Sequence, residues 1–241
     1  MTATRHPTKP GTTSLAQLCR TADRLLRRNT VDDDRNAVPY LLKAADAGSP
    51  WAQYQLGLAY HDGTGVRKNR RRARQWYELS AKQGYGSAQL NLGIIIANLP
   101  GKTRRLQSAI RLYRQAAAQG NPNACYNLGL YYETGRGVKK DPRRAFYWHK
   151  RAALLGQPDS QNFVGYSYFT GEGVRRDVAA AITWYRKAAR QSNVYAQFNL
   201  GLCYTFGDGV PLRIPTAIFW FRKAAARGHR GAKQQLTILG E

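Results

Sequence analysis

The fold is decided by the stretch from Ala124 to Ala153, which reads ACYNLGLYYETGRGVKKDPRRAFYWHKRAA. Its elements return every 36 residues along nearly the whole chain, as the step from Gly129 to Gly165 illustrates. One column holds Gly57, Gly93, Gly129, Gly165 and Gly201, and a bulky column holds Trp76, Leu112, Trp148, Trp184 and Trp220. A fixed period of this length indicates a protein built from stacked repeats.

The residue pattern of each repeat predicts two helices. Apolar or small residues recur three or four positions apart in two stretches: Ala124, Leu128 and Tyr132, then Ala145, Trp148 and Ala152. This spacing places them on one face of each helix. Between the helices, Gly135 and Gly137 can adopt the positive φ that reverses the chain. Asp141 suits the N-cap of the second helix and Pro142 its first position.

The glycine column lies inside the first helix, where glycine costs about 1 kcal/mol relative to alanine. Its return at Gly129 and at the equivalent positions predicts that another helix passes too close for a side chain. The Trp and Tyr columns keep the helical register of the alanines and leucines. We therefore interpret them as core, and not as platforms on which nucleic-acid bases stack.

This pattern of Ala, Leu-Gly, Tyr, Gly-x-Gly-Val, Asp, Ala, Trp, Ala-Ala and Gly resembles the Sel1-like repeat, a relative of the tetratricopeptide repeat, over residues 12–241. The resemblance implies an all-α fold, a right-handed α/α superhelical solenoid of two-helix repeats. It also implies a scaffold or adaptor that holds other proteins, often a bacterial one.

The register divides the chain into successive parts. We expect a disordered arm at 1–11, a degenerate N-terminal capping repeat at 12–47, repeats at 48–83, 84–119, 120–155, 156–191 and 192–227, and a C-terminal capping helix at 228–241. Asn69 still suits a helix cap, whereas Arg213 replaces the acid of that column. The turn around Pro100 and Gly101 lacks the Gly-x-Gly pattern, which predicts a different shape there.

The composition is strongly basic, with 38 Lys and Arg against 14 Asp and Glu and a formal net charge of +24. An acidic partner is the first implication. The cysteines Cys19, Cys125 and Cys203 occupy different positions of the repeat, so they predict neither a disulfide framework nor a metal site. A reducing compartment, the cytoplasm, is the simplest interpretation. No apolar run is long enough for a membrane span.

We find no catalytic constellation in the sequence. The histidines are scattered, and we interpret them as surface or packing residues: His6, His61, His149 and His229. The Gly-x-Gly turns lack the strand and the Lys-Ser/Thr of a phosphate-binding loop. We therefore predict a protein that is not an enzyme and needs no cofactor.

A polar ladder follows the first helix of the repeats. One column holds Gln53, Gln89, Gln161 and Gln197, and the column two residues later holds Gln55, Asn91, Asn127 and Asn199, with Phe163 interrupting it as a candidate apolar anchor. The first helix lines the concave face of such solenoids, so these amides are candidates for hydrogen bonds to an extended peptide. The alternative is that they satisfy neighbouring groups inside the solenoid.

A basic ridge is predicted at the turn before the second helix and at the start of that helix. Its members are Arg67, Lys68, Arg70, Arg71, Arg72, Arg104, Arg105, Lys139, Lys140, Arg143, Arg144, Arg175, Arg176 and Arg213. The fixed register predicts that these clusters stack along one edge, about 10 Å apart. Such a ridge is either a solvated face or a contact surface for an acidic protein or for phosphates.

Taken together, these features predict a non-enzymatic scaffold or adaptor that binds a protein partner through its concave face, its basic edge, or both. A bacterial immunity or inhibitor protein is one specific form of this prediction. The alternative is a nucleic-acid-associated protein that uses the ridge for phosphate contacts. The sequence leaves the oligomeric state and the identity of the partner open.

Overall fold

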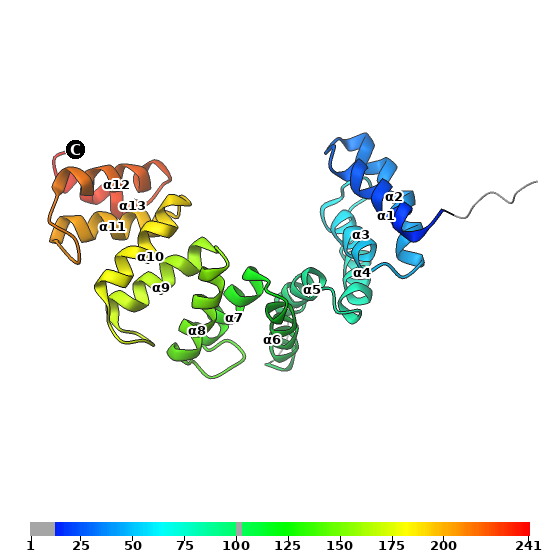
Figure 1. Cartoon of the computed structure of the whole chain (residues 1–241), viewed down its shortest axis with the longest axis horizontal. Coiled ribbons are helices and arrows are strands. Elements are labelled where there is room, and N and C mark those ends of the chain that lie inside the picture. The colour runs from blue at the N-terminus through cyan, green and yellow to red at the C-terminus, as the bar shows by residue number, and fades with distance from the viewer. Residues whose placement is uncertain (1–12, 100–102) are drawn as a thin grey trace, which may run out of the picture. The chain divides into compact units, whose positions relative to one another are not determined.

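The computed structural model describes residues 13–99 and 103–241, and all regular structure within these ranges is helical. The helices fall into two compact units, Met1–Ile95 and Ile96–Glu241 (Figure 1). The arm expected at 1–11 and the distinctive turn expected at Pro100 and Gly101 lie outside the described residues. The all-α solenoid of two-helix repeats is confirmed.

The first unit contains helices that follow one another with short connections. They are α1 (Leu15–Leu26), α2 (Val31–Asp46), α3 (Pro50–Asp62), α4 (Arg70–Lys82) and most of α5 (Gly86–Asn98), which crosses the boundary between the units. From α1 to α4, each helix packs against the next one in the chain. This sequential packing is the arrangement expected of a repeat protein.

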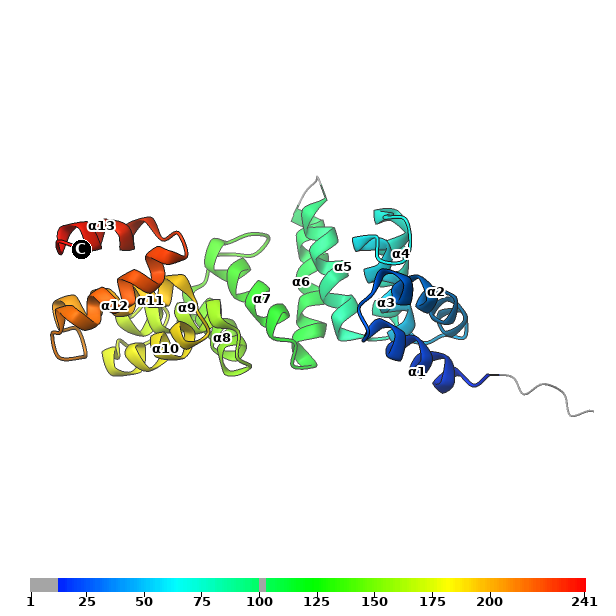
Figure 2. The same cartoon turned by 90° about the horizontal axis from the view of Figure 1, so that it is seen from above.

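The second unit continues the same pattern. Its helices are α6 (Thr103–Ala118), α7 (Pro122–Thr134), α8 (Pro142–Leu154), α9 (Pro158–Thr170), α10 (Val178–Arg190), α11 (Val194–Phe206), α12 (Ile214–Ala226) and α13 (Arg230–Ile238). Figure 1 and Figure 2 both show α11, α12 and α13 in succession at the C-terminal end of this unit. Two helices per 36-residue period are therefore observed, as the sequence predicts.

The helix ends match the turn chemistry of the sequence. The Asp141 carboxylate accepts a hydrogen bond of 2.9 Å from the backbone N–H of Arg144, which caps α8. Gly135 and Gly137 both have φ of 74°, so the chain reversal after α7 uses left-handed backbone that favours glycine. At Arg213 the N-cap of α12 forms no side-chain hydrogen bond, which agrees with the loss of the acid at this column.

The second glycine of the Gly-x-Gly turn packs on the start of the preceding second helix. A Cβ atom on Gly137 would lie 2.7 Å from Leu106 Cβ in α6, and one on Gly209 would lie 2.6 Å from Val178 Cγ1 in α10. One on Gly173 would collide with the Pro142 carbonyl oxygen of α8. Each of these turns therefore lies against the helix start that carries the previous basic cluster.

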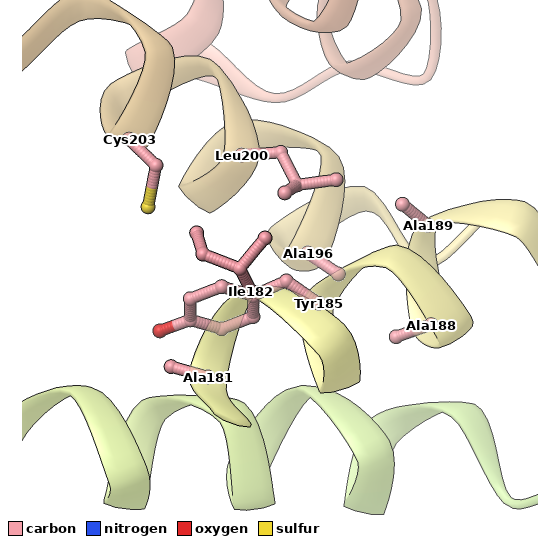
Figure 3. Packing of buried hydrophobic residues seen from close by; sticks show 8 residues of the cluster. All are labelled: Ala181, Ile182, Tyr185, Ala188, Ala189, Ala196, Leu200 and Cys203. Carbon is pink, nitrogen blue, oxygen red and sulfur yellow. The ribbon is translucent and has the colours of Figure 1, made fainter. Parts of the chain in front are cut away.

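The core lies between successive helices. Figure 3 shows one cluster, in which Ile182 and Tyr185 of α10 lie beside Ala196 and Leu200 of α11. A Cβ atom on Gly165 would lie 2.6 Å from the ring of Tyr185. The close approach predicted for the glycine column is thus present, and the close neighbour is an aromatic ring of the second helix.

The bulky column is less buried than predicted. Trp184 is buried, whereas Trp76, Trp148 and Trp220 are only partly buried. The fully buried column is the next one, and it holds Tyr77, Tyr113, His149, Tyr185 and Phe221. The ring that faces the glycine of the first helix fills the core, so the tryptophans beside it pack at the edge of the core. The prediction of a tryptophan core is therefore correct only for Trp184.

Candidate functional site

The first amide column of the ladder belongs to the interior. The amide Nε2 of Gln161 donates a 3.1 Å hydrogen bond to the carbonyl of Ala153 at the end of α8, and this side chain is buried. The same bond, to the residue eight positions earlier, is made by Gln53, Gln89 and Gln197. These amides satisfy helix-end carbonyls that would otherwise be unpaired. A partner-binding role is therefore wrong for Gln53, Gln89, Gln161 and Gln197, because their side chains are not accessible.

The second amide column is more open. Gln55, Asn91, Asn127 and Asn199 are all partly exposed on the first helices of their repeats. Within the second unit, Asn199 Nδ2 donates a 3.1 Å hydrogen bond to Asn162 Oδ1. That these side chains contact a partner stays a prediction.

A pocket of about 740 Å³ opens on the second unit. It is lined by residues of α7, α8, α9 and α11, by Lys140 of the turn that follows α7 and by Glu172 of the turn that follows α9. Its lining includes the predicted apolar anchor Phe163. We call this pocket the acidic groove, because it gathers carboxylates, with aromatic rings around them. The carboxylates are Glu133, Asp159 and Glu172, and the rings are Tyr126, Phe163, Tyr166 and Tyr195. Lys140, a member of the basic ridge, also lines it.

His149 lies at the floor of the acidic groove and is only 1% exposed. Its ring stacks on Phe163 with ring centroids 4.0 Å apart. Nδ1 lies 3.0 Å from Ser160 Oγ. Nε2 lies 3.5 Å from Glu133 Oε2, yet it makes no hydrogen bond within the described part of the chain. One polar edge of this buried ring is therefore not hydrogen-bonded.

Burial lowers the pKa of His149, and the nearby Glu133 carboxylate only partly opposes this shift. The imidazole is therefore neutral at pH 7. Nδ1 and the Ser160 hydroxyl form one hydrogen bond, whose direction depends on the tautomer of the ring, and Nε2 faces the Glu133 carboxylate. The order Ser, His and acid is that of a hydrolytic triad, but Ser160 is completely buried. A nucleophile must reach its substrate, so this trio is a polar part of the core.

His149 is a packing residue, which is one of the two interpretations that its place in the sequence allows. Its grouping with Ser160 and Glu133 was not predicted. A signal was present in the repeat register. His149 stands in the column of Tyr77, Tyr113, Tyr185 and Phe221, and Ser160 stands in the column of Ala52, Ala88, Ala124 and Ala196. Two polar departures in adjacent repeats therefore meet at one contact.

Every residue of the predicted basic ridge is exposed. In the second unit, Lys140, Arg143 and Arg175 line one surface pocket of about 610 Å³, so the clusters of two consecutive repeats meet there. Arg144 pairs with Asp141 at 3.3 Å, while 65% of its side chain remains exposed. A surface pair of this kind stabilises the fold little. The ridge is thus formed locally, and its functional role stays a prediction.

Three further predicted properties concern the cysteines, metal binding and membrane spans. Cys125 and Cys203 are buried free thiols, and burial raises the pKa of Cys203 to about 12. Across residues 13–99 and 103–241, no group of His, Cys, Asp or Glu side chains is arranged to hold a metal ion. No described helix combines the length and the apolar character needed to cross a membrane.

Comparison with known families agrees with this architecture. Successive matches to the Sel1 repeat cover residues 29–49, 52–85, 86–121, 122–157, 158–193 and 194–229. The matches extend over most of the chain, and the protein belongs to the Sel1 repeat family. This is a solenoid fold of protein interaction.

Among solved structures, a protective antigen of uropathogenic Escherichia coli is 30% identical with a TM-score of 0.82. The match covers 93% of this chain and 48% of the antigen chain. A Sel1 repeat protein from Oxalobacter formigenes is 29% identical with a TM-score of 0.78. That match covers 88% of this chain and 84% of the Oxalobacter chain. The chitin synthase regulator of Saccharomyces cerevisiae is 43% identical over 49 residues, which are 20% of this chain and 7% of that protein. The chain therefore spans less than half of the first and a small part of the third.

Proposed function

We propose that this protein is a non-enzymatic scaffold or adaptor that binds an acidic protein through its basic ridge. The observation that carries the proposal is the exposure of every ridge cation at the same place in successive repeats. The packing of the Gly-x-Gly turns on the preceding helix starts supports it, because it brings Lys140, Arg143 and Arg175 to one surface pocket. That the partner is a toxic enzyme held by an immunity protein stays a prediction.

The mechanism is preorganisation. The ridge cations stand on turns and first helical turns that the repeat packing already fixes, so little backbone order is lost when a partner docks. Exposed like charges also steer an oppositely charged partner and raise its association rate. Arginine supplies most of the ridge, and its planar guanidinium group can bind a carboxylate through two hydrogen bonds.

The test is an affinity pull-down with a matched pair of variants. The bait is the whole chain, incubated with lysate of the native organism with and without nuclease, washed at low and high salt, and analysed by mass spectrometry. Arg143→Glu, Arg144→Glu and Arg175→Glu together reverse the ridge in the second unit. Arg190→Glu, Arg227→Glu and Arg230→Glu make the same charge change at exposed residues outside it.

We expect one stoichiometric protein that survives nuclease, is retained by the control and is lost with the ridge variant. Retention of that protein by both variants would contradict the role of the ridge. The remaining alternative is nucleic acid. If all captured material disappears with nuclease and binding weakens steeply with salt, phosphate contacts replace an acidic protein as the function of the ridge.

A further inference from the structure

The acidic groove has the opposite charge to the molecule that carries it. The chain has 38 cations and only 14 acids, yet Glu133, Asp159 and Glu172 line one pocket of the second unit, and its cation is Lys140. The buried His149 ring adds no charge, because it is neutral at pH 7. The groove therefore presents a net negative charge inside a strongly positive protein.

The carboxylates of the groove are not paired with a cation in the part of the chain that the structure describes. None of Glu133, Asp159 and Glu172 forms an ion pair there with a lysine or arginine, and the neighbour of Glu133 is the neutral His149 ring. The acids at the start of α2 differ, since Asp32 and Asp33 pair with Arg35 and Arg28 at 3.8 and 3.6 Å. The α2 acids also lie in the first turn of their helix, where the helix dipole favours negative charge. Asp159 follows the same rule, because it lies in the first turn of α9. Helix stabilisation does not explain Glu133 at the end of α7 or Glu172 in the turn after α9.

A second observation at the same place points to a ligand. His149 is 1% exposed, lines the groove, and has an Nε2 atom without a hydrogen bond in the described part of the chain. Glu133, 3.5 Å from that atom, is half-buried and retains unused acceptor positions. Buried polar groups in native proteins are rarely left unpaired. A donor group that enters the groove would complete the hydrogen bonds of the Glu133 carboxylate.

The walls fit the remainder of a basic side chain. Tyr166 and Tyr195 line the groove and are 47% and 62% exposed, so a ligand can contact both side chains. Lysine and arginine bind over aromatic faces, and their methylene groups pack against apolar surface. Asp159 is held in place, because Asn193 Nδ2 donates to it at 2.7 Å. The groove thus combines a fixed carboxylate with aromatic contact area.

We propose that the acidic groove binds an extended segment of a partner protein that inserts an arginine or lysine side chain between Glu133 and Glu172, against the rings of Tyr166 and Tyr195. Charge complementarity selects this occupant over an acidic segment. Binding in the acidic groove is a function separate from that of the ridge, since the groove is a pocket and has the opposite charge. An experiment can therefore refute one of the two functions without refuting the other.

The test uses a defined probe and the whole chain. A fluorescein-labelled, terminally capped pentapeptide carries one arginine between leucines, and its control carries citrulline in place of arginine, which removes the charge with little change in shape. Fluorescence anisotropy measures both. Glu133→Gln with Glu172→Gln removes two groove charges, and Asp32→Asn with Asp62→Asn removes two exposed charges of the first unit.

We expect the arginine peptide to bind about tenfold more tightly than the citrulline peptide, and the groove variant to lose about tenfold in affinity. The Asp32 and Asp62 variant should change the affinity less than about twofold. The ridge variant should bind the peptide at least as tightly as the native chain, so a failed ridge leaves this result intact. Equal binding of both peptides, or equal losses in both acid variants, overturns the proposal.

A second copy of this chain is the competing occupant, because its own ridge is basic. Sedimentation velocity of the native chain at assay concentrations separates the two cases. A monomer that binds the arginine peptide supports the partner segment. A dimer that Glu133→Gln with Glu172→Gln converts to a monomer assigns the groove to self-association and overturns the proposal.

Discussion

The contact between α7 and α8 differs from the contact between α11 and α12 in the ring that the second helix places against the glycine of the first. Gly129 and Gly201 hold the same place in their first helices, and each would collide with a ring if it carried a Cβ atom. The ring is His149 in the first pair and Phe221 in the second. Phe221 only packs, whereas His149 packs and also contacts Ser160 and Glu133. The packing therefore requires a ring at this position. The polar ring of His149 adds contacts that packing alone does not require.

The same two helix pairs differ at the start of their second helices. Asp141 caps α8 with a 2.9 Å hydrogen bond, whereas Arg213 gives α12 no side-chain cap. A missing N-cap costs about 1 kcal/mol. Departures from the repeat thus cost stability, and we expect them to persist where they contribute to a surface such as the acidic groove or the ridge.

The largest effect is expected from filling the glycine position. Gly129→Val places a branched side chain where a Cβ atom would already lie 2.6 Å from the His149 ring, so the free energy of unfolding should fall by about 3 kcal/mol. Gly201→Val should lose as much, because the need for space is common to both contacts. Ala179→Val, at an exposed position of α10, is the control. Chemical denaturation gives all three values, and an unchanged free energy of unfolding for Gly129→Val would refute the close-packing argument.

The second effect concerns the polar pair in the core. His149→Phe copies Phe221 but leaves the buried Ser160 hydroxyl without its partner, which should cost about 2 kcal/mol. Adding Ser160→Ala restores the pattern of the other repeats and should recover most of this loss. Denaturant unfolding of the single and double variants measures the coupling. Additive losses would show that His149 and Ser160 do not act together.

The third effect tests the cap. Arg213→Asp should stabilise the second unit by about 1 kcal/mol, because it supplies the acceptor that Asp141 supplies to α8. Asp141→Ala should destabilise by a similar amount. Thermal unfolding measures both changes. Equal and small shifts in the same direction would mean that the caps do not distinguish these helices.

A smaller effect is expected in the pH dependence of stability, because only the contact between α7 and α8 contains a histidine ring. The pKa of His149 is lowered in the folded chain, so the unfolded chain binds the proton first as pH falls. Stability from the neutral ring is complete above the unfolded value of about 6.5 and declines below it, down to the folded pKa. Between pH 7 and 5 the native chain should lose more stability than the His149→Phe, Ser160→Ala variant. Parallel stability curves would exclude a contribution from His149.

The smallest effect is expected at the ridge. Arg143→Glu with Arg144→Glu changes exposed side chains, so the free energy of unfolding should stay within about 0.5 kcal/mol of the native value. Circular dichroism during thermal unfolding is sufficient to test this. A larger loss would mean that these cations support the fold and that their effect on binding cannot be separated from stability.

The sequence predicted the helices, their caps and the close approach at the glycine column, because each depends on local spacing or on one residue type. It could not decide the role of Gln161, since an amide at a fixed place serves an inner carbonyl or a partner equally well. The packing of α9 against the end of α8 decides its burial. The acidic groove was missed for a related reason: Glu133, His149 and Asp159 belong to three helices, and only their packing joins them.

The most direct test of the account is hydrogen exchange of the whole chain with and without the arginine peptide at saturating concentration, read by mass spectrometry. We predict slower exchange at the end of α7, along α9 and in the turn at 171–174, with no change at the acidic start of α2, residues 31–35. Protection at 31–35, or protection nowhere in the second unit, would contradict the claim that the polar departures of this repeat build a binding site.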